Sequence, residues 1–307
     1  MSKKGRSLFP PIPEPLPIPI IDNHTHVGQD REGQVQGVDE DGNLRYPLLV
    51  EGQIAAMIKA GVSHAITVGC EVPDLVDVIE LAHAHPEFSA AIAIHPNEAA
   101  MHAGVREIAP DGLEPNVADH HREYDLADAI NRVAELARDV VAIGETGLDY
   151  FRTGEEGKGA QQESFRAHIR LAKELGLPLQ IHDRDAHEDT VRILLEEGAP
   201  ERTVFHCFSG DRHLAEILAV HGWYASFSGT VTFPKNIELR EALEILPSEL
   251  ILVETDAPYL TAHPYRGRPN APYLATLTAR VISEIRNVPL VTVCEQIVET
   301  TNRVYFS

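Results

Sequence analysis

The chain has 307 residues, of which 43% are hydrophobic and 24% are charged, and its formal net charge is −21 at pH 7. This length suits two ordinary domains or one large α/β barrel, since such barrels have about 250 residues or more. The negative charge argues against broad nonspecific binding to a polyanion, although it leaves room for an anionic substrate that metal ions hold in one cleft.

The N-terminal segment is rich in proline. Residues Met1 to Arg6 are basic, but six prolines interrupt the segment from Leu8 to Ile20. Prolines at this density exclude the apolar helix of a signal peptide, and no apolar stretch reaches the roughly 18 residues that span a membrane. We therefore expect residues 1–17 to form an arm on the surface. The three cysteines are scattered without zinc-ribbon spacing, which favours reduced thiols in a cytoplasmic protein.

Apolar and amphipathic segments alternate along the rest of the chain. The apolar segments predict eight β-strands, at residues 17–21, 64–70, 88–95, 140–144, 178–181, 203–205, 223–227 and 250–253. The amphipathic segments predict helices at residues 50–60, 73–85, 125–138, 160–174, 186–197, 211–221, 237–246, 271–286 and 289–304. Gly61 is suited to end the first of these helices, and Asp211 is a suitable N-cap.

Nearly continuous apolar strands that alternate with helices are typical of a parallel sheet. The count of eight favours a closed (β/α)8 TIM barrel over an open doubly wound sheet. No glycine-rich phosphate loop follows the first strand, which weakens the dinucleotide-binding alternative. Because no linker divides the chain, the sequence predicts one α/β barrel domain over residues 18–307.

Histidines and carboxylates follow the predicted strands. His24 and His26 end the first strand and, being two residues apart, would point to the same face. Five other strands are followed by a residue of the same kind: His95, Glu145, His182, His206 and Asp256. A His-X-His pair alone arises easily in a chain with 16 histidines. Six segments that end in this way indicate a site at the C-terminal strand ends, where barrel enzymes bind their substrates.

These side chains have the chemistry of metal ligands. Four histidines and two carboxylates are enough for two divalent cations, with one carboxylate as a bridge. Mixed nitrogen and oxygen ligands suit zinc, manganese, iron or nickel more than calcium, while magnesium remains possible. A metal pair about 3.5–4 Å apart can activate water and stabilise the attacking and leaving oxygens of a displacement. The residues therefore predict a metal-assisted hydrolase.

At this point the chain resembles the TatD family of metal-dependent deoxyribonucleases, within the wider metal-dependent hydrolase superfamily. The resemblance covers residues 20 to 306, and the order of its motifs is more specific than any one of them. The motifs are Asp22–His26 (DNHTH), Gly144–Tyr150 (GETGLDY), Ile181–Arg184 (IHDR), His206–Gly210 (HCFSG), Glu254–Leu260 (ETDAPYL) and Arg266–Gly267 with Asn270 and Pro272.

The resemblance implies a ligand set for two divalent cations, which would be Mg, Mn or Zn. The first metal would be held by His24, His26, Glu145 and Asp256, and the second by Glu145, His182 and His206, so that Glu145 bridges them. Asp256 would also orient and deprotonate the attacking water. His95 and Arg266 would contact the substrate phosphate, although His95 could instead cap its strand and Arg266 could order its own loop.

The implied activity is a deoxyribonuclease that cleaves phosphodiester bonds from an end, as a 3′–5′ exonuclease, on single-stranded DNA or a DNA end. No membrane and no obligate protein partner is expected. The main alternative is hydrolysis of an amide, ester or lactone by the same metal centre. Binuclear amide hydrolases of this superfamily often use a modified lysine as the bridge, whereas this chain offers Glu145, which favours the nuclease. A third alternative is a non-catalytic protein that metal ions stabilise.

Two regions depart from the family pattern. The loop at residues 29–49 and the segment at residues 104–123 look longer than in a typical member, and both would lie near the mouth of the site. His120 and His121 fall in the second region, and we expect them on the surface.

Overall fold

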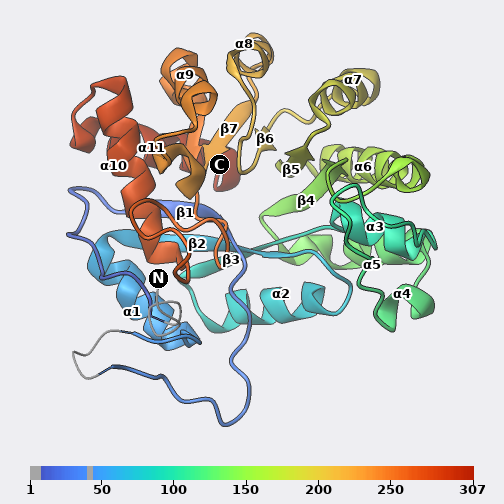
Figure 1. Ribbon diagram of the computed structural model, residues 1–307, viewed down its shortest axis with the longest axis horizontal. Helices are drawn as coiled ribbons and strands as arrows, with labels where there is room; N and C mark the ends of the chain where they lie inside the picture. The colour runs from blue at the N-terminus through green and yellow to red at the C-terminus, as the bar shows by residue number, and fades with distance from the viewer. Residues whose placement is uncertain (1–7, 40–43) are drawn as a thin grey trace. The chain divides into compact units, whose positions relative to one another are not determined.

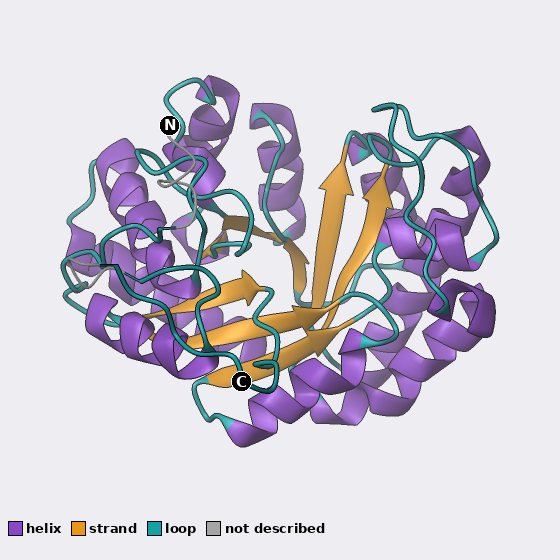
Figure 2. Ribbon diagram, turned by 60° about the horizontal axis from the view of Figure 1, so that its bottom comes forward, coloured by secondary structure: helices purple, strands orange, loops and turns teal. Residues whose placement is uncertain are grey.

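The computed structural model describes residues 8–39 and 44–307. Strands and helices alternate along the chain (Figures 1 and 2), and the strands form one eight-stranded sheet in chain order, β1 to β8. Every strand pair whose register is described is parallel. A parallel sheet in chain order with helical crossovers is the topology of the (β/α)8 fold, so the predicted fold class is confirmed.

The bounds of the elements are as follows. The strands are β1 Ile20–Thr25, β2 Val62–Gly69, β3 Phe88–Ile92, β4 Ala142–Asp149, β5 Leu179–Arg184, β6 Thr203–Phe205, β7 Tyr224–Phe227 and β8 Ile251–Val253. The helices are α1 Val50–Ala60, α2 Asp74–Ala84, α3 Pro96–His102, α4 His120–Glu123, α5 Leu126–Leu136, α6 Glu155–Leu175, α7 His187–Glu197, α8 Arg212–His221, α9 Ile237–Ile245, α10 Ala275–Arg286 and α11 Leu290–Tyr305.

The chain forms two compact units. Unit 1 comprises residues 1–67, 81–89 and 210–307, and unit 2 comprises residues 68–80 and 90–209. Each unit contains apolar strands that are buried along most of their length. The predicted division into an arm at residues 1–17 and one barrel domain at residues 18–307 stays a prediction.

Unit 1 contains β1, α1 and the elements from α8 to α11. Helix α1 agrees with the predicted helix at both ends, and Gly61 ends it in a left-handed conformation with φ 85°. The glycine N–H then bonds the carbonyl groups of Ile58 and Met57, which satisfies two backbone acceptors that a helix end leaves unpaired. Asp211 caps α8 as expected, since its carboxylate accepts the N–H of Leu214 at 3.0 Å.

The N-terminal arm is held against unit 1 rather than lying free on its surface. Phe9 and Leu16 are only 2% and 6% exposed, and the hydroxyl of Tyr273 donates to the carbonyl of Pro10 at 2.6 Å. Prolines have no N–H to donate to a strand ladder, so a proline-rich segment does not form a regular strand, and its carbonyl groups here accept bonds from side chains. The described part of the arm therefore has both buried and exposed residues, and its assignment as a surface arm stays a prediction.

Unit 2 contains β4, β5 and β6 together with the helices from α3 to α7. Strand β4 continues to Asp149, five residues beyond the predicted end, because its last residues pair with β5 as far as Arg184. Gly147 makes this pairing possible: its φ is 140°, and a Cβ there would lie 2.2 Å from the carbonyl oxygen of His182. Glu145 and His182 consequently lie within their strands and not at the ends, which corrects the sequence prediction.

Helix α6 begins at Glu155, five residues earlier than predicted. The early start depends on Glu107, whose carboxylate accepts the N–H groups of Glu156 and Gly157 at 3.3 and 3.0 Å. A carboxylate near these N–H groups also interacts favourably with the helix dipole. The cap comes from 50 residues away along the chain, which explains why a local pattern did not predict it.

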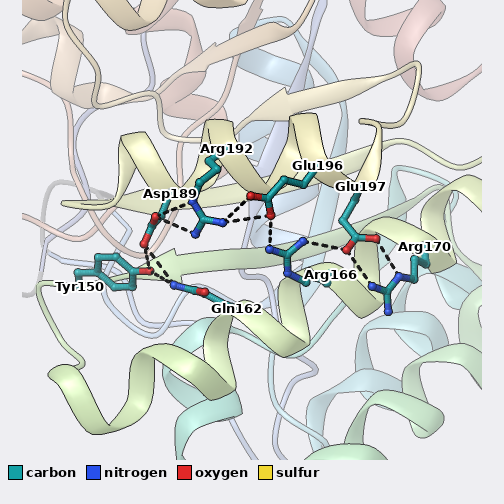
Figure 3. Close-up of polar contacts among 8 residues, drawn as sticks. All are labelled: Tyr150, Gln162, Arg166, Arg170, Asp189, Arg192, Glu196 and Glu197. Carbon is teal, nitrogen blue, oxygen red and sulfur yellow. Dashed lines mark hydrogen bonds and ion pairs between the residues drawn. The ribbon is translucent and has the colours of Figure 1, made fainter.

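Charged side chains join α6 to α7 on the exterior of unit 2. Figure 3 shows Arg166 between Glu196 and Glu197, with Arg170 forming a second pair with Glu197. Arg192, on α7, pairs with Asp189 and Glu196 at 2.9 Å. Such pairs at partly exposed positions add modest stability and reduce the effect of the many carboxylates in this part of the chain.

Over residues 8–39 and 44–307, none of the helices has both the length and the apolar character that crossing a bilayer would require.

Candidate metal centre

The candidate ligands of unit 1 lie at the ends of β1 and β8. The two residues before His24 fix the backbone there: Asp22 accepts the N–H of Thr255 at 2.8 Å and the hydroxyl of Thr255 at 2.5 Å. The amide of Asn23 donates to the carbonyl of Val253 at 2.8 Å. Burial raises the pKa of Asp22 well above its usual value. Asp22 and Asn23 therefore hold the two strand ends together, while the histidines that follow are positioned by this framework.

Asp256 lies beside this histidine pair. Its backbone has φ 53°, and its N–H donates to the carbonyl of His24 at 2.9 Å. The N–H of His26 in turn donates to the carbonyl of Ala257 at 2.7 Å. With the backbone held in this way, Asp256 Oδ1 lies 3.4 Å from His26 Nε2, and the rings of His24 and His26 are 5.1 Å apart between centroids. Unit 1 thus brings two imidazoles and one carboxylate together, as predicted.

The candidate ligands of unit 2 meet at Glu145. Its Oε2 lies 3.1 Å from His182 Nδ1 and 2.6 Å from His206 Nε2. Glu145 and His206 are both 5% exposed. His206 directly follows β6, as predicted. Three of the six predicted ligands are therefore adjacent within this unit.

Asp149 is a member of this cluster that sequence reasoning did not single out. Its Oδ2 lies 3.1 Å from His182 Nε2. Burial would raise the pKa of Asp149, but hydrogen bonding to His182 outweighs burial and lowers that pKa to about 2. Burial likewise lowers the pKa of His182, while its bonds to Asp149 and Glu145 raise it to about 9. Asp149 lies four residues after Glu145, on the same face of β4, and this period-two spacing is the signal that could have revealed it.

His95 lies three residues after β3 and caps α3. Its Nδ1 accepts the N–H of Asn97 at 3.1 Å, so His95 caps the helix that follows and not its strand, and its contact with a substrate phosphate stays a prediction. Its ring contacts that of His182 at a centroid distance of 4.6 Å. Burial and then the positive charge of His182 lower the pKa of His95 to about 4. A neutral imidazole with one nitrogen engaged in the cap is therefore present at the edge of the unit 2 cluster.

Arg266 is exposed and lies over the ring of Phe233, 4.7 Å from the centroid. The nearby Asn270 has a structural role, since its amide donates to the carbonyl groups of Thr255 and Tyr259. These contacts order the segment after β8. The contact of Arg266 with Phe233 is compatible with a loop-ordering role, and both this role and a contact with a phosphate stay predictions.

The donors in unit 2 fit a divalent cation. The ligand atoms of His95, Glu145 and His182 all lie within 4.8 Å of one another. Imidazole and carboxylate groups are ligands that suit zinc and manganese. The imidazole of His182 also has a partner on its other side, since Asp149 Oδ2 lies 3.1 Å from its Nε2. Such partners are the usual means of orienting a histidine ligand.

Comparison with known proteins places these residues in a family. The family model described as "TatD related DNase" matches residues 21–306. The uncharacterized metal-dependent hydrolase TatD of Mycobacterium tuberculosis is 38% identical over 272 residues, which cover 87% of this chain and 90% of that protein. YabD of Bacillus subtilis, also an uncharacterized metal-dependent hydrolase, is 34% identical and the match covers 80% and 88% of the two chains. The crystal structure of YjjV, a TatD homolog from Escherichia coli K12, superposes with a TM-score of 0.75 at 25% identity and covers 94% of this chain and 98% of that one.

Proposed function

The chain belongs to the TatD-related DNase family of metal-dependent hydrolases, and from this premise we propose that it hydrolyses phosphodiester bonds of DNA with two divalent cations. The proposed substrate is a single strand or a DNA end, degraded in the 3′–5′ direction in the cytoplasm. The observation that carries the proposal is the position of Glu145, whose carboxylate lies within contact distance of the imidazoles of His182 and His206 in unit 2. A carboxylate in this position can act as the bridge of a metal pair.

We assign the ligands by strand and by family motif. His24, His26, Glu145 and Asp256 hold the first cation in this proposal. The second cation is held by Glu145, His182 and His206. When bound, such cations lower the pKa of the attacking water and neutralise the negative charge of the phosphate oxygens.

The side chains of the protein have separate roles in the proposed reaction. Asp256 orients the attacking water and accepts its proton, since its carboxylate is held next to His26 and its backbone is fixed by His24. His182 keeps its orientation because Asp149 holds its Nε2. His95, which is neutral and fixed by Asn97, faces the substrate phosphate and can donate a hydrogen bond to it through its other nitrogen.

The experiment that tests this function compares two classes of substrate. The purified protein is freed of metal with EDTA, supplied with Mg²⁺, Mn²⁺ or Zn²⁺, and incubated with single-stranded oligonucleotides that carry phosphorothioate linkages at either the 3′ or the 5′ end. We expect metal-dependent release of mononucleotides that a 3′ block stops and a 5′ block does not. Amides, esters and lactones form the second class. Turnover of these compounds together with intact DNA would overturn the proposal.

Replacing Asp256 tests the catalytic assignment. We expect Asp256→Asn to reduce kcat by about 10²–10⁴-fold, the usual contribution of a general base, while the circular dichroism spectrum stays unchanged. Asp139→Asn, at an exposed position, is the matched control and should retain full activity. Full activity in Asp256→Asn would remove this residue from the mechanism.

A further inference from the structure

A second group of metal-ligand side chains lies in unit 2, apart from the residues of the proposed active site. Its members are Glu98 and His102 on α3 and His120 and His121 on α4, and one ligand atom from each lies within 4.8 Å of the others. The two helices are neighbours in Figure 1. The side chains of Glu98, His120 and His121 are 10%, 11% and 0% exposed, so the expectation that His120 and His121 lie on the surface is wrong. Packing of α4 on α3 buries them.

The tautomer of His102 is determined by its surroundings. Its Nδ1 lies 2.7 Å from the carbonyl oxygen of Tyr124, and because a carbonyl only accepts, Nδ1 carries the proton. Nε2 therefore presents a lone pair. That atom is buried and has no hydrogen-bond partner among the described residues. His102 as a whole is only 4% exposed.

A buried nitrogen without a partner is unfavourable, since burying an acceptor that makes no bond costs free energy. A hydrogen-bonded cluster of Glu98 with two histidines would account for Glu98, His120 and His121. It would not account for His102, whose lone pair remains unused. The geometry therefore leaves a place beside His102 for a partner of this lone pair, which is either a hydrogen-bond donor or a metal cation.

The carboxylate of Glu98 is at the centre of the group. Its Oε2 lies 3.1 Å from His120 Nε2 and 2.7 Å from His121 Nε2. The separation between Glu98 and His120 is close to the about 3.3 Å edge of a tetrahedron with metal–ligand bonds of about 2.0–2.1 Å. Burial raises the pKa of Glu98, and burial followed by repulsion from Glu98 raises that of Glu71 nearby. A bound cation would relieve both effects.

His121 differs from the other two histidines. Its Nδ1 accepts the N–H of Ala118 at 2.9 Å, so its neutral ring carries the proton on Nε2 and donates it to Glu98. This is the arrangement of a residue that orients a carboxylate ligand through a hydrogen bond. His121 is thus a positioning residue and not itself a ligand.

We propose that Glu98, His102 and His120 bind a zinc ion, with His121 holding the carboxylate in place and water completing the coordination. Two imidazoles and one carboxylate match the ligands that zinc prefers. The ion links α3 to α4 and fixes both ends of the long segment between them. This site is separate from the two cations of the proposed active site and does not depend on the reaction that those cations serve.

The test counts metal ions per chain in the full-length protein. After equilibration with Zn²⁺ and gel filtration, elemental analysis should find one zinc fewer per chain in His102→Gln than in the wild type. His213→Gln, at an exposed position on α8, is the control and should keep the wild-type content. An unchanged zinc content in a folded His102→Gln protein would overturn the proposal.

A second pair of variants separates this site from the active site and covers a failure of His102→Gln to fold. Joint replacement of His24, His26 and His182 by glutamine should leave one zinc per chain, and adding His120→Gln, at a partly exposed position, should remove it. Co²⁺ in place of zinc should give the absorption bands of a low-coordinate site in the first of these proteins only. His121→Gln should retain the ion with an affinity about 10–100-fold lower. No bound zinc in the triple variant would sink the site, whatever its activity on DNA.

Discussion

Asp149 Oδ2 lies 3.1 Å from His182 Nε2, while the other nitrogen of that ring faces Glu145. This makes Asp149 the outer partner of a proposed metal ligand. We expect Asp149→Asn to weaken binding of the second cation about 10–100-fold, because a neutral amide supports the imidazole less well than a carboxylate does. Competition with a fluorescent chelator measures the affinity. Asp128→Asn, at an exposed position on α5, controls for the loss of one charge, and equal affinities in the two variants would leave Asp149 with a purely structural role.

The hydrogen bonds between Asp22 and Thr255 predict a large effect on stability. Asp22→Ala would leave three buried donors without an acceptor, namely the N–H groups of His24 and Thr255 and the hydroxyl of Thr255. Since each unpaired buried group costs about 1–3 kcal/mol, we expect the free energy of unfolding to fall by at least about 3 kcal/mol. Asp22→Asn keeps one oxygen acceptor and should lose less. Urea denaturation of both variants gives the comparison, and an equal loss in the two would mean that the side chain acts through its charge.

In the motif that contains Asp22, the local sequence predicts the histidines but not the long-range hydrogen bonds. Strand alternation predicted His24 and His26 as ligands, and the structure brings both next to Asp256. The same motif gave no sign that Asp22 and Asn23 connect β1 to β8. Their partners are more than 200 residues away along the chain, and such pairing depends on the whole fold.

Local pattern also failed where tertiary contacts lengthen or bury an element. The apolar pattern of the fourth strand ends at Gly144 and so does not indicate Asp149, and only pairing with β5 shows that the strand continues. His121 was expected on the surface because its segment is polar. The carboxylate of Glu98, 23 residues earlier, compensates for its burial. In both cases a contact with a residue far away along the chain determines where the polar side chain lies, and the local sequence does not show that contact.

Replacing Arg266, which lies over the ring of Phe233, distinguishes a role in ordering its loop from a role in binding a substrate phosphate. A cation–π contact at an exposed position contributes about 0.5–1 kcal/mol, so Arg266→Ala should cost little stability if the loop alone is at stake. A contact with a DNA phosphate should instead raise KM about 10–100-fold with little change in kcat, since bonds to charged groups contribute about 1.5–3 kcal/mol. Steady-state kinetics on a short oligonucleotide decide between these outcomes. Arg212→Ala removes an exposed arginine on α8 and should leave KM unchanged.

Because the ring of His168 is buried, we expect the free energy of unfolding to fall in mild acid. The residue is fully buried on α6, where its Nε2 accepts the N–H of Ile94 at 3.2 Å and its Nδ1 donates to the carbonyl of Ser164 at 2.7 Å. Burial lowers its pKa to about 4 in the folded protein, against about 6.5 in an unfolded chain. As the pH falls, the unfolded state takes up the proton first. The contribution of His168 to stability is therefore complete above about pH 6.5 and is lost progressively towards pH 4.

The expected loss from this one residue is about 2–3 kcal/mol between pH 7 and pH 4.5, because each pKa unit corresponds to about 1.4 kcal/mol. Urea denaturation of the metal-free protein at the two pH values measures it. His168→Gln keeps an acceptor for Ile94 and removes the titrating group, so its stability should fall less steeply over the same range. Replacing the exposed His213 in the same way should leave the slope of the wild type. A variant without His168 that loses as much stability as the wild type would show that other groups cause the acid sensitivity.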